Sequence, residues 1–76
     1  MTDQPTLSDR LAKAMTRVAE AEYHISNQAA HVADLQRTGQ NARRSSMILV
    51  TLREAHDRFQ KEVEHIFKEM QRNTHP

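Results

Sequence analysis

The stretch LQRTGQNA, residues 35–42, decides the fold, because helix-ending and helix-starting residues stand together there. Gly39 is the only glycine of the chain. It suits the left-handed C′ position that ends many helices, since a residue without a Cβ adopts positive φ easily. Asn41 suits the N-cap of a following helix, where its side-chain oxygen can accept a free backbone N–H. The stretch therefore predicts a turn between two helices.

On the N-terminal side of this turn, apolar residues recur at alternating spacings of four and three. Glu22 interrupts this stripe, which otherwise consists of Leu11, Met15, Val18, Ile25, Ala29 and Val32. Before the stripe, Thr6 and Asp9 have the Thr-x-x-Asp form of a capping box, which marks a helix start. The pattern predicts an amphipathic helix over about residues 6–38.

On the C-terminal side, the same spacing predicts a second helix, over about residues 41–72. Its stripe consists of Ser45, Leu49, Leu52, His56, Phe59, Val63, Ile66 and Met70. A connection this short between long helices favours an antiparallel hairpin. We predict an all-α hairpin as a single domain over residues 1–76, with frayed termini at 1–5 and 73–76.

Folding the chain about Gly39 pairs positions whose residue numbers add up to about 78, so Glu22 meets His56. A Glu–His pair in the seam would satisfy both polar groups and fix the register of the two helices. In the alternative arrangement, both side chains reach the edge of the seam and do not touch. The sequence also leaves open whether such a pair only sets the register or senses pH.

The chain carries more apolar surface than one hairpin seam uses. Around residues 47–52 apolar side chains point almost all round the helix, and such a helix is normally buried on all sides. We expect two hairpins to associate as a homodimer, forming a four-helix bundle. The residues predicted for this self-association or partner surface are Ala14, Ala21, Leu35, Met47, Ile48 and Val50.

Histidines are the side chains that invite a metal or binding interpretation. His24, Gln28 and His31 lie within two turns of one helix and form a candidate surface site. First-row metal sites need three or four convergent ligands, which no level of the hairpin offers, so we predict no metal and no cofactor. One glycine excludes a glycine-rich phosphate loop, and the serines lack an identifiable base, so we predict no catalytic residues.

Composition restricts the partners and the compartment. The chain has 76 residues, no cysteine and a net charge of +1, with basic and acidic residues well mixed. This balance is not typical of nucleic-acid binders, and Arg43 with Arg44 is only an isolated basic pair. The start of the chain does not resemble a signal peptide, and the run MILV is far too short to span a membrane. We expect a cytoplasmic protein without membrane or nucleic-acid partners.

The stretch AEYHISNQAAHVADLQRTGQ, residues 21–40, resembles a group of very short, uncharacterised alphaproteobacterial proteins. The pattern is an acidic-x-His-Ile start, a glutamine four residues after the histidine, and a Leu-x-x-x-Gly turn. The matching positions are Glu22, His24, Ile25, Gln28, Val32, Leu35 and Gly39, with a looser fit at Leu49, Thr51 and Phe59. The resemblance covers about residues 18–60. It implies a helical hairpin in a bacterial cytoplasm and no activity that could be carried over.

The sequence thus predicts a non-enzymatic, homo-oligomeric helical interaction or regulatory module. One alternative is an accessory protein whose apolar surface around residues 47–52 binds a different protein. A further alternative is a metal-binding helical protein that uses its histidines.

Overall fold

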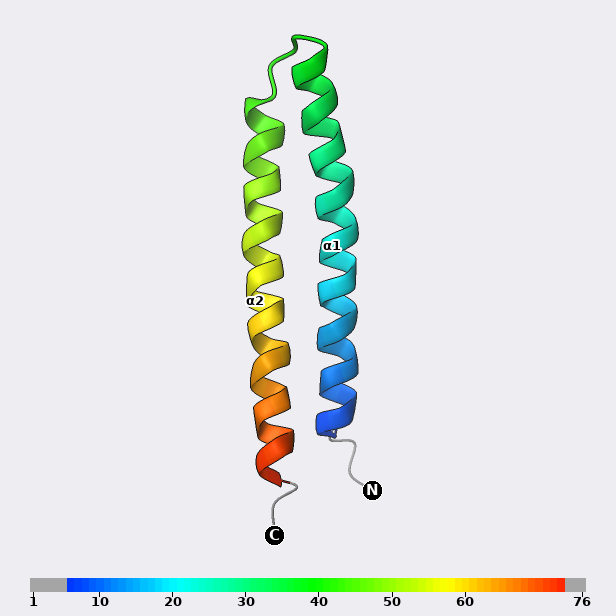
Figure 1. Ribbon diagram of the computed structural model, residues 1–76, viewed down its shortest axis with the longest axis vertical. Coiled ribbons are helices and arrows are strands. Elements are labelled where there is room, and N and C mark those ends of the chain that lie inside the picture. Colours follow the sequence, from blue (N-terminus) through cyan, green and yellow to red (C-terminus); the bar gives the residue numbers. More distant parts are fainter. Residues whose placement is uncertain (1–5, 74–76) are drawn as a thin grey trace.

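The computed structural model describes residues 6–73, which form two long antiparallel helices joined by a short turn (Figure 1). Helix α1 spans Leu7–Arg37 and helix α2 spans Arg43–Asn73, with 31 residues each. The hairpin is a rod with extents of 60 × 26 × 14 Å. The predicted all-α hairpin is confirmed. Of the predicted frayed ends, residues 1–5 and 74–76 lie outside the described residues, whereas residue 73 still belongs to α2.

Helix α1 begins with the predicted capping box. The Thr6 hydroxyl accepts from the Asp9 backbone N–H at 3.1 Å, and the Asp9 carboxylate accepts from the Thr6 backbone N–H at 3.3 Å. The two contacts satisfy two N–H groups that have no partner within the helix. The helix therefore starts at the point that the sequence pattern indicates.

Helix α1 ends in a Schellman motif at the predicted glycine. Gly39 has φ of +73°, the N–H of Gln40 donates to the carbonyl of Leu35, and the N–H of Gly39 donates to the carbonyl of Gln36. These two bonds satisfy carbonyls that the last helical turn leaves free. The turn is thus built as predicted, and its geometry depends on one residue without a side chain.

Helix α2 begins two residues later than predicted, at Arg43. Its first backbone bond runs from the N–H of Ser46 to the carbonyl of Ala42. The side chain of Asn41 accepts the N–H of Arg43 at 2.9 Å, so it does satisfy a free donor of the first turn. Helix boundaries commonly differ by one or two residues where a cap and a turn overlap.

The seam of α2 consists of the predicted stripe. All eight residues of that stripe are buried or half-buried, and Leu49 and Ile66 are the most deeply placed of them. Their spacing of four and three residues keeps one face of the helix on the partner helix over its whole length. The period was therefore identified correctly in the second half of the chain.

The seam of α1 differs from the prediction at every second position. Ala14 and Ala21 are only 1% and 6% exposed, whereas Met15 is 54% exposed and Glu22 is exposed as well. The observed stripe has alternating spacings of four and three from the first residue of the helix: Leu7, Leu11, Ala14, Val18, Ala21, Ile25, Gln28, Val32 and Leu35. Small alanines let α2 approach α1 closely, which larger side chains at those positions would prevent.

This correction changes the predicted self-association surface. Ala14 and Ala21 are buried in the hairpin's own seam, and Leu35 lies half-buried on the same stripe. These three residues were predicted to face a second hairpin, but α2 covers Ala14 and Ala21 instead and leaves part of Leu35 exposed. Positions three and four residues apart share a helix face, so the spacing alone admits both stripes.

Candidate interaction surface

The hairpin has two lateral sides that differ in chemistry. On one of them, cross-helix ion pairs join α1 to α2: Arg10 with Glu69 and Arg17 with Glu62, each at 3.7 Å. Nε2 of His65, one turn earlier on α2, also lies 2.8 Å from Oε1 of Glu69. We call this face the ion-pair side. Charged side chains there bridge the edge of the seam, and such partly exposed pairs contribute only about 0.2–1 kcal/mol each.

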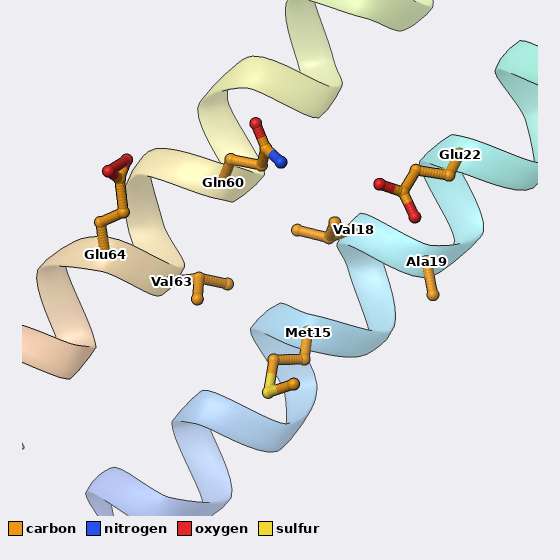
Figure 2. A pocket seen from close by; sticks show the side chains of 7 residues that line it. All are labelled: Met15, Val18, Ala19, Glu22, Gln60, Val63 and Glu64. Atoms are coloured by element: carbon orange, nitrogen blue, oxygen red, sulfur yellow. The ribbon is translucent and has the colours of Figure 1, made fainter.

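The opposite face carries an open groove of about 480 Å³ (Figure 2). We call this face the open side. Val18 and Val63 point toward each other across the groove, and Met15 extends into the space beside them. The other lining residues are Ala19, Glu22, Gln60 and Glu64. The groove thus has an apolar floor along the seam and a polar rim.

Glu22 and His56 meet at the edge of this groove. Oε2 of Glu22 lies 3.1 Å from Nε2 of His56, and the side chains are 60% and 20% exposed, respectively. The histidine therefore occupies the seam, while the carboxylate reaches it from the open side. Glu22 stands on the flank of the apolar stripe and not within it, because Ala21 takes the seam position.

A second polar contact crosses the seam nearer the turn. The side-chain amide of Gln28 donates to the backbone carbonyl of Ser45 at 2.9 Å, and this contact is partly buried. Gln28 is therefore not available to the candidate surface site with His24 and His31. Those two histidines are exposed. The ring of His24 packs edge-on against the ring of Tyr23, with 5.7 Å between the ring centroids.

The structure does not assemble a metal-binding cluster from the described residues. Within residues 6–73, no three His, Asp or Glu side chains lie close enough together to hold an ion. The three members of the candidate surface site likewise form no common site, because the amide of Gln28 is directed to α2.

The three apolar residues predicted near the start of α2 are exposed but do not form one patch. Met47, Ile48 and Val50 are 64%, 46% and 53% exposed. At 100° per residue, Met47 and Val50 share a face, whereas Ile48 lies about 160° from Val50, across the helix. A single flat partner cannot cover all three side chains. By helical position, Val50 lies toward the open side and Ile48 toward the ion-pair side.

Two large apolar side chains on the open side were not predicted to be exposed. Met15 was assigned to the seam and is exposed, and Phe67, which follows the fully buried Ile66, is 51% exposed. Helical position places Phe67 on the same face as Gln60, seven residues earlier. The correct choice of seam stripe on α1 would have identified Met15 as a surface residue, and the correctly predicted stripe of α2 already excludes Phe67.

Comparisons with known proteins identify no relative. No protein-family model, no curated protein and no solved structure matches the chain. The resemblance to short alphaproteobacterial proteins therefore stays a prediction. Neither of the two helices, over the residues described, is long and apolar enough to cross a membrane.

Proposed function

We propose that the chain is a non-enzymatic, cytoplasmic interaction module in which two hairpins associate into a four-helix bundle. The observation that carries this proposal is the surface area of the hairpin. A compact monomer of 8.8 kDa is expected to expose about 4,800 Å². The whole chain of 76 residues exposes 6222 Å². About 1,400 Å² per chain is therefore surplus, and a standard interface buries about 800 Å² per partner.

The small core supports the same proposal. Among the described residues, five apolar side chains are buried, and two of these are alanines: Ala14, Ala21, Val32, Leu49 and Ile66. Chains of this size are marginally stable without disulfides, metals or oligomerisation, and this chain contains no cysteine. Burial of a second helical face by another copy would supply the missing apolar contact.

Sedimentation equilibrium at several micromolar concentrations tests the proposal. We expect the mass of a dimer, or of a tetramer formed from dimers, together with a helical circular-dichroism spectrum. A well-folded monomer across this concentration range would contradict the proposal, because the surplus surface would then be tolerated by the isolated hairpin.

A second candidate function is an accessory protein that binds a different protein through the start of α2. The observation that favours it is the exposure of Met47, Ile48 and Val50 around one helical turn, because a partner that wraps the helix would bury all three. This alternative predicts a loosely folded monomer when the chain is purified alone. The same sedimentation and circular-dichroism measurements therefore separate the two functions.

A further inference from the structure

We propose that the second copy docks on the open side, with its α1 antiparallel to the first α1 about a two-fold axis near residues 22 and 23. This inference rests on the proposed homo-oligomeric function and specifies its interface. The four-helix bundle is then built from an α1–α1 contact and a neighbouring α2–α2 contact. Three features of the hairpin lead to this arrangement.

The first feature is the difference between the two lateral sides. The ion-pair side has two cross-helix ion pairs, from Arg10 and Arg17 to glutamates of α2. A second hairpin placed there would desolvate these charges, at a penalty that new contacts rarely repay. The open side instead presents a groove with Met15, Val18 and Val63 on its floor. Apolar surface of this kind gains free energy when it is removed from water.

The second feature is the pattern of α1 on the open side. Next to the groove, small exposed residues recur every seven positions: Ala12, Ala19, Ser26 and Ala33. Met15 and the half-buried Ala29 lie between them, so a second stripe with alternating spacings of three and four runs along the helix. Small side chains allow two helices to approach closely, and larger neighbours such as Met15 can then fill the holes between them.

This second stripe is nearly symmetric about residues 22 and 23. Reversing its direction places Ala12 opposite Ala33 and Ala19 opposite Ser26. A two-fold interface brings one surface against its own copy, so a stripe that reads alike in both directions is self-complementary when antiparallel. The groove at Met15 then receives the stretch around Ala29 and Ala30 of the second copy. A parallel arrangement would place Met15 against Met15 and leave no small residue to accommodate it.

The third feature is charge. Asp9 and Arg37 flank the stripe at its opposite ends, so antiparallel packing brings unlike charges together twice. At the level of the axis on α2, the same operation brings Arg53 near Asp57 of the second copy. Unlike charges facing each other set the orientation of an interface and disfavour the alternative one.

Glu22 lies close to the axis, where two copies would otherwise repel each other. Each Glu22 is already paired with His56 of its own chain at 3.1 Å. This contact directs the carboxylate of each Glu22 toward α2 of its own chain and off the α1–α1 contact. This explains how an acidic residue is accommodated in the middle of an otherwise small and apolar stripe.

Single-cysteine variants test the face and the orientation, since the chain has no cysteine of its own. Ala19→Cys and Ser26→Cys are purified separately, mixed and oxidised. We expect a disulfide between the two variants and little cross-linking of either variant alone, because disulfides need Cβ atoms about 3.5–4.5 Å apart. The matched control pair is Glu20→Cys with Asn27→Cys, which is equally spaced and exposed but is turned away from the open side; we expect no disulfide.

The outcomes separate this inference from the proposed function. Cross-linking of Ala19→Cys to itself would show a parallel dimer, and cross-linking of the control pair would show a different face; either result overturns the inference. If wild-type protein sediments as a dimer and neither pair cross-links, the interface is elsewhere and the proposed function stands. If wild-type protein sediments as a monomer, both proposals fail.

A charge variant gives an independent test in solution. We expect Ala19→Arg to raise the dissociation constant of the dimer at least tenfold, because two arginines would lie near the axis. Asn27→Arg adds the same charge to an exposed position on α1 outside the interface and should leave the constant unchanged. Equal dissociation constants for the two variants would overturn the proposed face. Circular dichroism above the dissociation constant verifies that both variants fold.

Discussion

Ala21 and Glu22 are neighbours in the sequence, and the spacing of the apolar residues allows either of them to occupy the same seam position. Sequence spacing favoured the stripe through Met15 and Glu22 and placed Ala14 and Ala21 at its flank. In the structure Ala14 and Ala21 face α2 instead, and Glu22 reaches His56 from the edge. Close approach of two helices favours small residues at the contact, and hydrophobicity alone does not reveal that requirement. The Glu22–His56 contact was still predicted correctly. Glu22 lies one residue away from the seam position that Ala21 occupies, and both residues stand at the level of His56 along the hairpin.

The seam assignment predicts a large loss of stability at one position and almost none at its neighbour. Ala21→Leu should lower the free energy of unfolding by about 1–3 kcal/mol, because the added side chain has no room against α2. Glu20→Leu inserts the same side chain at an exposed position of the same helix and should change stability by less than about 0.5 kcal/mol. Urea denaturation of both variants measures the difference. Equal stability of the two would mean that Ala21 is not in the seam.

Gly39 offers a test of the turn that is free of packing effects. A Cβ at this position meets no atom within 4 Å, so only the backbone conformation at φ +73° opposes a side chain. Gly39→Ala should therefore destabilise the hairpin by about 1–2 kcal/mol, the usual penalty of left-handed backbone. Gly39→Asn should cost less, because asparagine tolerates that conformation better. Thermal unfolding followed by circular dichroism would show this order, and the reverse order would refute the backbone explanation.

The pair of Glu22 and His56 can be measured by a double-mutant cycle. Glu22→Gln, His56→Gln and the double variant should give a coupling free energy of about 0.5–1 kcal/mol, as for partly exposed pairs. The reason for the small value is that Glu22 is 60% exposed and remains largely hydrated. A coupling of zero would mean that the 3.1 Å contact contributes nothing to the register.

At the scale of the helices, the two halves of the chain differ in how well the sequence predicted them. The stripe of α2 alternates large apolar residues with clearly polar neighbours, so one face stands out. In α1, alanines occupy seam and surface positions alike, and Ala14 cannot be distinguished from Ala12 by composition. Capping residues and the glycine predicted the helix ends to within two residues, because caps act locally and need no knowledge of the partner helix.

Contacts across the seam depend on rotamers that the sequence does not specify. The amide of Gln28 donates to the backbone of Ser45, whereas the sequence suggested a surface site with His24 and His31. A polar side chain in a seam position directs its hydrogen-bonding group toward whichever acceptor the packing exposes. The register of the two helices determines which acceptor lies opposite Gln28, so the sequence alone does not identify that acceptor.

The Gln28 contact predicts a local effect on the start of α2. Gln28→Met keeps the length of the side chain and removes the donor, which should weaken the anchoring of the first turn by about 1 kcal/mol. Amide hydrogen exchange around Ser46 should then become about fivefold faster, while exchange near Ile66 stays unchanged. Asn27→Met, at an exposed position of α1 outside the proposed interface, is the matched control without a seam contact. Uniform acceleration along the chain would indicate a global effect and contradict the local role.

At the scale of the whole molecule, the sequence indicated surplus apolar surface but misplaced it. Three of the six residues predicted to face a partner lie in the hairpin's own seam. Of the other three, Met47 and Val50 share a face, and Ile48 lies across the helix from Val50. Assigning a surface to a partner requires knowing first which stripe the hairpin itself uses. Once Ala14 and Ala21 are placed in the seam, the neighbouring stripe through Met15 and Ala19 becomes the face that is left over.

A dimer whose subunits depend on each other should unfold in a concentration-dependent manner. Association stabilises the folded state by mass action, so the midpoint of thermal unfolding rises with protein concentration. With an unfolding enthalpy of roughly 100 kcal/mol per dimer, each tenfold increase should raise the midpoint by roughly 5 °C. Ala19→Arg should unfold roughly 5 °C or more below the wild type at each concentration, because a tenfold weaker dimer affects the midpoint like a tenfold dilution, whereas Asn27→Arg should follow the wild type. A constant midpoint for the wild-type chain would mean that the hairpin is stable alone, and that its exposed side contributes nothing to folding.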